Sequence, residues 1–321
     1  MSEKKSLILV TNRFDNNLRH KLSQIEVGEF KYVSNIFEDA SLLEKAVGII
    51  TRSSTQVDTD FLNKAKSLKF LVTATSGFDH IDLNAAQAKG VRVFHVPETQ
   101  SVAAAELTIM MIFASARKWT LVNKQIQKGD WQRSLLLGKQ VAGQSLGIVG
   151  LGRVGTEVAK RAMALGLTVS AFDPFINKPL EGVAMLGFEE MMRSSDIISL
   201  HVPKTKKTRH MIKKETLGWM NTEATLINMS RGDVINESDL IDHLIKNSEF
   251  SAGLDVFAKE PLVTQSKLLS LSNVCLSPHV GASTVEALAN SSQKALDKVC
   301  SLLKGEAVEG ELPPKAPWYE G

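Results

Sequence analysis

Three loops in the second half of the chain carry polar side chains that together could move a hydride to or from a carbonyl carbon. Arg231 lies in the first loop, Asn-Met-Ser-Arg-Gly, Glu260 in the second, and His279 in the third, Ser-Pro-His-Val-Gly. Reduction of a ketone needs an acid for the developing alkoxide, and histidine is the usual acid near neutral pH. A neighbouring carboxylate would favour the protonated ring, and an arginine would clamp a substrate carboxylate with two hydrogen bonds. Each loop follows a strand-like segment, so a parallel sheet would bring all three to the edge where ligands bind.

A glycine-rich stretch predicts the partner in this chemistry, a dinucleotide. In GLGRVG (150–155), Gly150 suits a tight turn, Gly152 lets a pyrophosphate approach the backbone, and Gly155 lets helix and strand pack closely. The motif follows a strand-like segment and opens a helix-like one, and Asp173 stands 18 residues beyond Gly155. A carboxylate there accepts hydrogen bonds from a ribose 2′-hydroxyl and repels a 2′-phosphate. NAD is therefore favoured over NADP. Lys178, a nearby basic residue, leaves NADP as an alternative cofactor.

The elements that must position these loops alternate along the chain. In the first hundred residues the pattern predicts strands at 7–10, 30–33, 47–51, 70–74 and 91–96, and helices at 17–25, 58–67 and 83–88. In the second part it predicts strands at 146–149, 168–172, 197–200, 224–228, 252–256 and 274–276. Strands that alternate with helices at this spacing indicate parallel sheets with helices on both faces.

Three further segments carry structural predictions. The stretch 102–119 is predicted to be one long helix, apolar on most faces, which its own domain or a partner subunit must cover. Residues 283–286 form a capping-box pattern, which gives Ser283 a structural role. The proline-rich stretch 311–321 is predicted to be a loose terminus.

Composition excludes several classes of protein. The 321 residues are 43% hydrophobic and 23% charged, which excludes a disordered or collagen-like chain. Lys and Arg total 38 against 35 for Asp and Glu, and a net charge of +3 indicates neither nucleic acid nor a membrane as partner. Two cysteines make no disulfide framework, no metal site is predicted, and the apolar run 6–10 is too short for a signal peptide. We expect a cytoplasmic protein.

The motifs, taken in order, resemble the D-isomer-specific 2-hydroxyacid dehydrogenase family. The matching stretches are GLGRVG (150–155), HVPKTKKT (201–208), NMSRGDVIN (228–236), GLDVFAKEP (253–261) and SPHVGAST (277–284), supported by ATSGFDHIDL (74–83), AAEL (104–107) and GDW (129–131). The resemblance implies that His279 is the general acid and base, that Glu260 pairs with it, and that Arg231 binds the substrate carboxylate and carbonyl.

The same resemblance implies the remaining contacts and the architecture. The residues expected at the cofactor are Gly150, Gly152, Arg153, Val154, Gly155, Asp173, Val202, Met229 and Asp255. The residues expected at the substrate, besides Arg231, are Arg52 and the backbone amides of Ser76 and Gly77. We expect two doubly wound parallel-sheet α/β domains, with a Rossmann-type NAD domain (100–289) inserted in a flavodoxin-like substrate domain (1–99 and 290–321), and a homodimer.

Within the family the chain is most similar to short-form phosphoglycerate dehydrogenases, which would place it in serine biosynthesis. Arg52 matches a residue that faces the substrate in that branch, and Arg133 falls where a further basic residue is found. Thr73 stands where arginine is frequent and Gln100 where asparagine is usual, so glycerate or hydroxypyruvate is an alternative to 3-phosphoglycerate. Since the sequence stops at 321, we expect no C-terminal regulatory domain and no feedback through one.

Two other functions share this pattern. Formate dehydrogenases have the fold but pair the histidine with glutamine, so Glu260 argues against that assignment. An NAD(H)-sensing binding protein, similar to the C-terminal binding protein corepressors, would keep the same residues without metabolic turnover. Turnover of a 2-keto acid with NADH distinguishes an enzyme from such a sensor.

Overall fold

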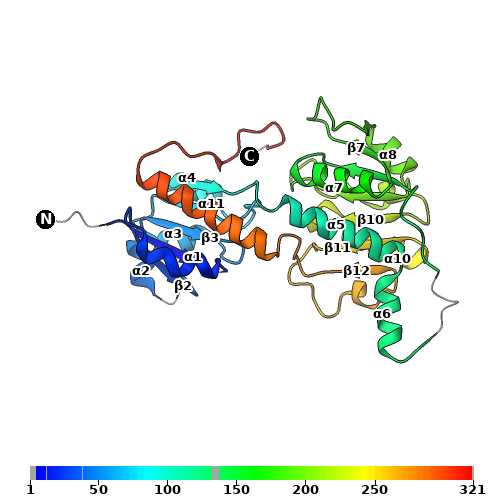
Figure 1. Ribbon diagram of the computed structural model, residues 1–321, viewed down its shortest axis with the longest axis horizontal. Helices are drawn as coiled ribbons and strands as arrows, with labels where there is room; N and C mark the ends of the chain where they lie inside the picture. The colour runs from blue at the N-terminus through cyan, green and yellow to red at the C-terminus, as the bar shows by residue number, and fades with distance from the viewer. Residues whose placement is uncertain (1–4, 12, 38, 132–136, 320–321) are drawn as a thin grey trace. The chain divides into compact units, whose positions relative to one another are not determined.

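The chain folds into two compact units, of which the first is discontinuous in sequence. The computed structural model describes residues 5–11, 13–37, 39–131 and 137–319. Unit 1 holds the described residues up to Gln100 together with Ala282–Tyr319, and unit 2 holds Ser101–Gly281 (Figure 1). The chain thus completes unit 2 before it returns to finish unit 1, and the long helix α11 (Val285–Leu303) lies wholly in unit 1.

Unit 1 is built on a six-stranded sheet in the order β13-β5-β4-β3-β1-β2. Its strands are β1 (Leu7–Thr11), β2 (Glu29–Val33), β3 (Gly48–Thr51), β4 (Phe70–Thr73), β5 (Arg92–His95) and β13 (Glu311–Leu312). Its helices besides α11 are α1 (Asn16–Lys21), α2 (Ala40–Lys45), α3 (Thr59–Lys64) and α4 (Leu83–Ala88), with a short 3-10 turn η1 (Leu22–Gln24). The strands β1 to β5 pair in parallel, as the alternating sequence pattern predicts.

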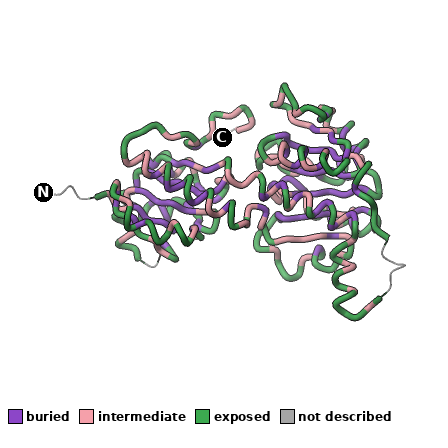
Figure 2. The backbone as a smooth tube through the Cα atoms, viewed as in Figure 1, coloured by how far each residue is buried: buried purple, intermediate pink, exposed green. Residues whose placement is uncertain are grey.

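The sheet of unit 1 carries buried apolar side chains on both of its faces. Along β1, Ile8 and Leu9 are both buried, yet they belong to two different core clusters, one on each face. Ile49 and Ile50 divide in the same way along β3. A parallel sheet covered by helices on both faces requires such continuous apolar runs. Figure 2 shows the buried residues following the strands of both units.

Unit 2 contains a seven-stranded, all-parallel sheet in the order β12-β11-β10-β9-β6-β7-β8. Its strands are β6 (Ser145–Val149), β7 (Thr168–Phe172), β8 (Val183–Met185), β9 (Ile197–Leu200), β10 (Thr225–Asn228), β11 (Ser251–Leu254) and β12 (Val274–Leu276). Its elements between strands are α7 (Arg153–Ala164), α8 (Phe188–Ser194), α9 (Lys214–Leu217), η3 (Gly232–Val234), α10 (Glu237–Lys246) and η4 (Lys267–Ser270). The strand order reverses at β6, which lies between β7 and β9, and such a switch point is where doubly wound sheets bind nucleotides.

Three sequence predictions need correction. The helix predicted over 102–119 is two helices, α5 (Ser101–Ala116) and α6 (Trp119–Gln127), because Lys118 has a left-handed backbone with φ of 49°. The helix cap predicted at Ser283 belongs to Thr284, whose side chain accepts a hydrogen bond from the N–H of Ala287.

The third prediction that needs correction is the loose terminus at 311–321. Glu311 and Leu312 form β13, which pairs antiparallel with β5. Two hydrogen bonds of 2.8 Å join the guanidinium of Arg92 to the carboxylate of Glu311. The side chain of Leu312 is buried in the core of unit 1.

Within the described part of the chain, none of the helices combines the length and apolar composition that crossing a lipid bilayer requires.

Candidate active site

The three loops singled out from the sequence leave neighbouring strands of the unit 2 sheet. The strands β10, β11 and β12 are adjacent and parallel, so their carboxyl ends share one edge. Arg231 follows β10, Glu260 follows β11, and His279 follows β12. Among the described residues, no group of three or more His, Cys, Asp or Glu side chains is arranged to hold a metal ion.

His279 and Glu260 are in direct contact at this edge. Nδ1 of His279 lies 2.7 Å from Oε2 of Glu260. The hydrogen bond to Glu260 raises the pKa of His279 above its usual value, against the opposing effect of burial. Burial works to raise the pKa of Glu260, but its hydrogen bonds from His279 and from the N–H of Phe257 lower it overall. The pair therefore favours an imidazolium beside a carboxylate, and about half of the His279 side chain remains exposed.

Arg231 lies close enough to act on both members of this pair. Its positive charge lowers the pKa of His279 and also that of Glu260. Its guanidinium Nη1 donates to the backbone carbonyl of Ser230 over 2.7 Å, which fixes part of the side chain. A histidine and an arginine at one edge would suit the reduction of a 2-keto acid, as an acid and a carboxylate clamp.

Asn228 holds the Arg231 loop in shape. Its Oδ1 accepts hydrogen bonds from the N–H and the hydroxyl of Ser230, and its Nδ2 donates to the carbonyl of Arg231. Gly232 lets this loop pass against the next one, since a Cβ there would lie 1.9 Å from the carbonyl of Phe257. The first loop is thereby seated against the loop that carries Glu260.

Asp255 holds the His279 loop. Its side chain is buried, and Oδ1 accepts from the hydroxyl of Ser277 and from the N–H of Val280. Oδ2 accepts from the N–H of Gly281 over 2.8 Å. His279 has a left-handed backbone with φ of 53°, a conformation that costs energy for a residue with a side chain and that these bonds stabilise.

The glycine-rich loop has the geometry of a pyrophosphate cradle. Gly150 has φ of +93° and passes so close to the carbonyl of His201 that a Cβ would lie 2.7 Å from it. A Cβ on Gly155 would lie 2.1 Å from the carbonyl oxygen of Gly150. A Cβ on Gly152, by contrast, would meet nothing within 4 Å, so the backbone at the start of α7 is accessible to a ligand. The residues present therefore fit a dinucleotide phosphate.

Asp173 follows β7 directly and is tied to this loop. Its Oδ2 accepts from the N–H of Leu151 and its Oδ1 from the N–H of Phe175, each over 2.9 Å. The carboxylate thus both shapes the glycine-rich loop and places negative charge beside it. Arg153 and Val154 begin α7, Val202 follows β9, and Met229 follows β10, so all four lie at this same edge of the sheet.

The predicted substrate residues of unit 1 lie at the carboxyl ends of its own strands. Arg52 follows β3, and its Nη1 donates to the hydroxyl of Ser291 over 3.0 Å. The N–H of Ser76 donates to Oε1 of Gln100, so that amide already has a partner and is not free to bind a carboxylate in this arrangement. Gly77 accepts a hydrogen bond at its carbonyl from Thr75. Arg133 lies outside the described residues.

Thr73, at the end of β4, is buried in a small polar cluster. Its hydroxyl lies 2.6 Å from that of Thr75 and 3.2 Å from Nε2 of His80, and all three residues are buried. The position therefore contributes no positive charge at this edge of the sheet.

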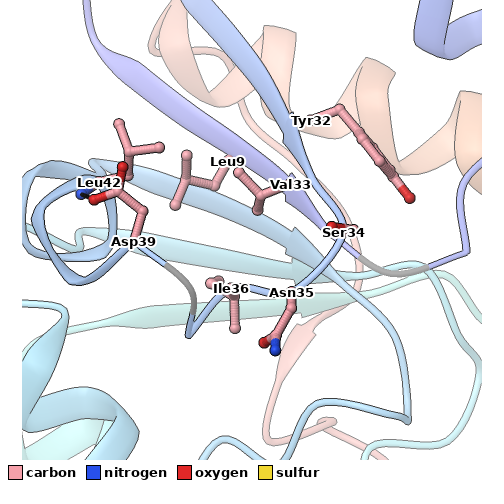
Figure 3. Close-up of a pocket in the computed structure, with 8 residues that line it drawn as sticks. All are labelled: Leu9, Tyr32, Val33, Ser34, Asn35, Ile36, Asp39 and Leu42. Atoms are coloured by element: carbon pink, nitrogen blue, oxygen red, sulfur yellow. Dashed lines mark hydrogen bonds between the residues drawn. The ribbon is translucent and has the colours of Figure 1, made fainter.

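A hollow of about 240 Å³ at another part of unit 1 lacks the chemistry of an active site (Figure 3). Tyr32, Asn35 and Asp39 supply polar groups to its lining. Asn35 accepts the N–H of Phe37, and Asp39 caps α2 by accepting the N–H groups of Ser41 and Leu42. Since these carboxylate and amide oxygens serve the local backbone and none of the described residues that line the hollow is an arginine or a histidine, we assign it no reaction.

Sequence reasoning missed the residues that hold the site together. Asn228 and Gly232 are inside the motif that was recognised, but only Arg231 was given a role. An asparagine followed two residues later by serine is a signal of a side-chain-stabilised turn, which could have identified Asn228. Asp255 was expected at the cofactor, and its carboxylate oxygens also accept hydrogen bonds from the His279 loop, a role that was not predicted.

Comparisons with known proteins show that the chain is similar to D-2-hydroxyacid dehydrogenases. Residues 109–281 match the family model described as D-isomer specific 2-hydroxyacid dehydrogenase, NAD binding domain. A hydroxypyruvate reductase of Thermotoga maritima is 36% identical over 253 residues, which cover 78% of this chain and 83% of that protein. A D-3-phosphoglycerate dehydrogenase of Methanocaldococcus jannaschii is 37% identical over 293 residues, 88% of this chain and 55% of that protein.

The chain also resembles solved structures of D-2-hydroxyacid dehydrogenases. The D-lactate dehydrogenase of Aquifex aeolicus, determined with NAD and lactic acid, superposes with a TM-score of 0.81 at 29% identity. The match covers 93% of this chain and 96% of that one. The chain spans about half the length of the curated phosphoglycerate dehydrogenases that it matches.

Proposed function

The chain belongs to the D-isomer-specific 2-hydroxyacid dehydrogenase family, and on that premise we propose that it transfers a hydride between NAD and a D-2-hydroxy acid or the corresponding 2-keto acid. The observation that carries the proposal is the contact of 2.7 Å between His279 and Glu260, beside Arg231. A histidine with a raised pKa next to a cationic clamp suits the protonation of a keto oxygen near neutral pH.

Each residue has one task in this mechanism. NAD supplies the group that accepts or gives the hydride. Arg231 binds the substrate carboxylate and draws electron density from the carbonyl oxygen. Nε2 of His279, the ring nitrogen that does not face Glu260, donates a proton to that oxygen during reduction and takes it back during oxidation. Glu260 holds the ring through Nδ1 and stabilises its protonated form.

The glycine-rich loop (150–155) would bind the cofactor. The N–H groups at the start of α7 would hold the pyrophosphate above Gly152, with Arg153 and Val154 in the first turn. Asp173 would bind the adenosine ribose and disfavour the additional phosphate of NADP. Val202 and Met229 would contact the cofactor from the ends of their strands.

The names of relatives limit the substrate to a small group of acids. Relatives named D-3-phosphoglycerate dehydrogenase and hydroxypyruvate reductase suggest 3-phosphoglycerate and its unphosphorylated counterpart, glycerate with hydroxypyruvate. Arg52 and the backbone amide of Gly77 remain our candidates for substrate contacts. The backbone amide of Ser76 is a weaker candidate, because it already donates to Gln100. A role in serine biosynthesis and a cytoplasmic location stay predictions.

We also propose that the protein is a homodimer. Large apolar side chains are exposed on α5 (Val102, Met110 and Phe113) and on α6 (Trp119 and Ile126). Exposed apolar side chains gathered on neighbouring helices are typical of a surface that a partner covers. Light scattering of the full chain at micromolar concentration tests this: a dimer mass supports it, and a monomer mass contradicts it.

Turnover tests the proposed function. The full chain should oxidise NADH in the presence of hydroxypyruvate or 3-phosphohydroxypyruvate, with the reaction followed by absorbance. His279→Gln should retain NADH affinity and lose turnover. Tight NADH binding without turnover of any 2-keto acid would contradict the enzyme and favour an NAD(H)-sensing protein.

A further inference from the structure

The segment that follows α11, dark red in Figure 1, is tied to unit 1 at several points. Nζ of Lys298, on α11, donates to the carbonyl of Glu309 over 2.6 Å. The carbonyl of Gly310 accepts the N–H of His95, the last residue of β5, over 2.9 Å. Together with the pairing of β13 to β5, these contacts fix the path of the chain up to residue 312. The residues that follow therefore start from a fixed point at the edge of the sheet.

Residues 313–319 lead from this point to two aromatic side chains. Three prolines within 313–317 restrict the backbone, which lowers the entropy lost when the segment is held in one place. The N–H of Tyr319 donates to the carbonyl of Ala316 over 3.0 Å and closes a turn. The ring of Tyr319 lies 6.2 Å from the ring of Phe78, centroid to centroid. Trp318 meets Tyr319 edge-on at 6.1 Å.

Phe78 belongs to the loop after β4 that carries the candidate substrate amide, since it directly follows Gly77. The same loop is tied to β5, because Nδ1 of His95 donates to the carbonyl of Ser76 over 2.9 Å. The rings of Phe78 and His95 meet edge-on at 5.6 Å. Phe78 therefore contacts one ring from the end of β5 and one, Tyr319, from the segment after β13. Aromatic pairs at such distances stabilise each other beyond the area that they bury.

The two aromatic residues of the terminal segment contribute little to the core of unit 1. Among the described residues, Tyr319 and Trp318 belong to neither core cluster of this unit, whereas Phe78 packs against one of them. Both rings are only partly buried. Their contact with Phe78 thus acts on the loop 76–78 more than on the stability of the sheet.

We propose that residues 311–319 form a strap that holds the loop 76–78 in place, and that Tyr319 is a positioning residue for binding of the 2-keto acid. The inference rests on the proposed function, in which the backbone amide of Gly77 contacts the substrate. A loop that is already ordered binds a ligand more tightly, because binding loses less conformational entropy. Without the ring of Tyr319 the substrate would have to order the loop itself, which weakens binding but leaves the chemistry in the complex unchanged.

Steady-state kinetics of the full chain with hydroxypyruvate and NADH test the strap. Tyr319→Ala should raise KM for hydroxypyruvate about two- to tenfold, the effect of losing one aromatic pair, and change kcat less than about twofold. The Kd for NADH should stay at the wild-type value, because the loop 76–78 belongs to unit 1. Tyr319→Phe keeps the ring and should show the wild-type KM.

Tyr32→Ala is the matched control, because Tyr32 is the second of the two tyrosines and is also partly buried in unit 1. It lies on β2, at the opposite edge of the sheet from β13, where it contacts Arg19. This variant should keep the wild-type KM. If Tyr319 acts through Phe78, adding Tyr319→Ala to Phe78→Ala should raise KM no further. An unchanged KM in Tyr319→Ala, an equal rise in Tyr32→Ala, or a further rise in the double variant would overturn the proposal.

Amide hydrogen exchange separates failure of the strap from failure of the proposed function. The N–H of Ser76 donates to Gln100 and the N–H of Ile81 to the carbonyl of Phe78, so exchange at these two amides reports opening of the loop. Without substrate, both should exchange about two- to tenfold faster in Tyr319→Ala than in the wild type, and at the wild-type rate in Tyr32→Ala. If the wild type turns over no 2-keto acid, the proposed function fails, and the exchange comparison still decides the strap. Identical exchange in the wild type and Tyr319→Ala would contradict it.

Discussion

The backbone N–H of His279 donates to the backbone carbonyl of Asp255 over 2.8 Å. This bond anchors the proposed acid, which follows β12, to the end of the neighbouring strand β11. The carboxylate of the same aspartate accepts the N–H groups of the two residues that follow His279. Asp255 thus fixes the loop on both sides of the histidine. The ring contacts Glu260, and the backbone that carries it has a left-handed conformation.

Asp255→Asn should therefore impair catalysis through the position of His279. An amide in place of the carboxylate would present a donor to buried N–H groups, and unsatisfied buried groups cost about 1–3 kcal/mol in the free energy of unfolding. A displaced acid should lower kcat about 100-fold, with the NADH affinity changed much less. Urea unfolding and steady-state kinetics measure the two effects. Wild-type kcat in this variant would remove Asp255 from the positioning of His279.

Gly232→Ala tests how the Arg231 loop is seated. The new Cβ would lie 1.9 Å from the carbonyl of Phe257, so the backbone around residue 232 must move. We expect kcat/KM for a 2-keto acid to fall about 100-fold, because Arg231 moves with the loop. Gly187→Ala is the control, since a Cβ there would meet only the far end of Glu190 at 3.9 Å. Similar kinetics in both variants would show that the close approach at Gly232 has no functional weight.

Arg231→Lys separates charge from geometry. Lysine keeps the positive charge but loses the planar pair of donors that fits a carboxylate. The expected result is a fall of about 10–100-fold in kcat/KM for the 2-keto acid, the cost of one charged hydrogen bond. The Kd for NADH, measured by fluorescence titration, should stay at the wild-type value. A loss of NADH affinity instead would assign Arg231 to the cofactor.

Asp173→Asn tests the choice of cofactor. An asparagine oxygen can still accept the N–H of Leu151, so the bond to the glycine-rich loop should remain while the negative charge and the acceptor of the Phe175 N–H are lost. The ratio of NADP to NAD affinity should rise about tenfold, because repulsion of the 2′-phosphate disappears. Asp173→Ala removes the acceptor as well and should weaken both cofactors. An unchanged ratio in Asp173→Asn would show that the charge does not select NAD.

The sequence pattern predicted the strands of the parallel sheets except β8, because continuous apolar runs and the spacing of glycines are local signals, whereas β8 (Val183–Met185) is only three residues long. It placed Arg231, Glu260 and His279 at strand ends, and the contact of Glu260 with His279 was expected from resemblance. The tail strand β13 was missed because two residues, Glu311 and Leu312, show no periodicity, and their pairing with β5 is a tertiary contact.

Other features depended on details that no pattern records. Ser283 and Thr284 are adjacent and both suit a helix cap, so only the backbone geometry decides between them. The break at Lys118 has no glycine or proline to signal it. The role of Asp255 depends on which N–H groups its oxygens accept, which follows from the path of the 277–281 loop rather than from residue type.

The pH dependence of 2-keto acid reduction by wild type and Glu260→Gln tests the central claim most directly. Reduction needs protonated His279, so kcat/KM should be high below the raised pKa of His279 and fall as the pH rises through it. Glutamine removes the charge that raises this pKa, so in Glu260→Gln the fall in kcat/KM should begin at lower pH. A Glu260→Gln profile that coincides with that of the wild type would contradict the assignment of His279 and Glu260 as the acid and its partner.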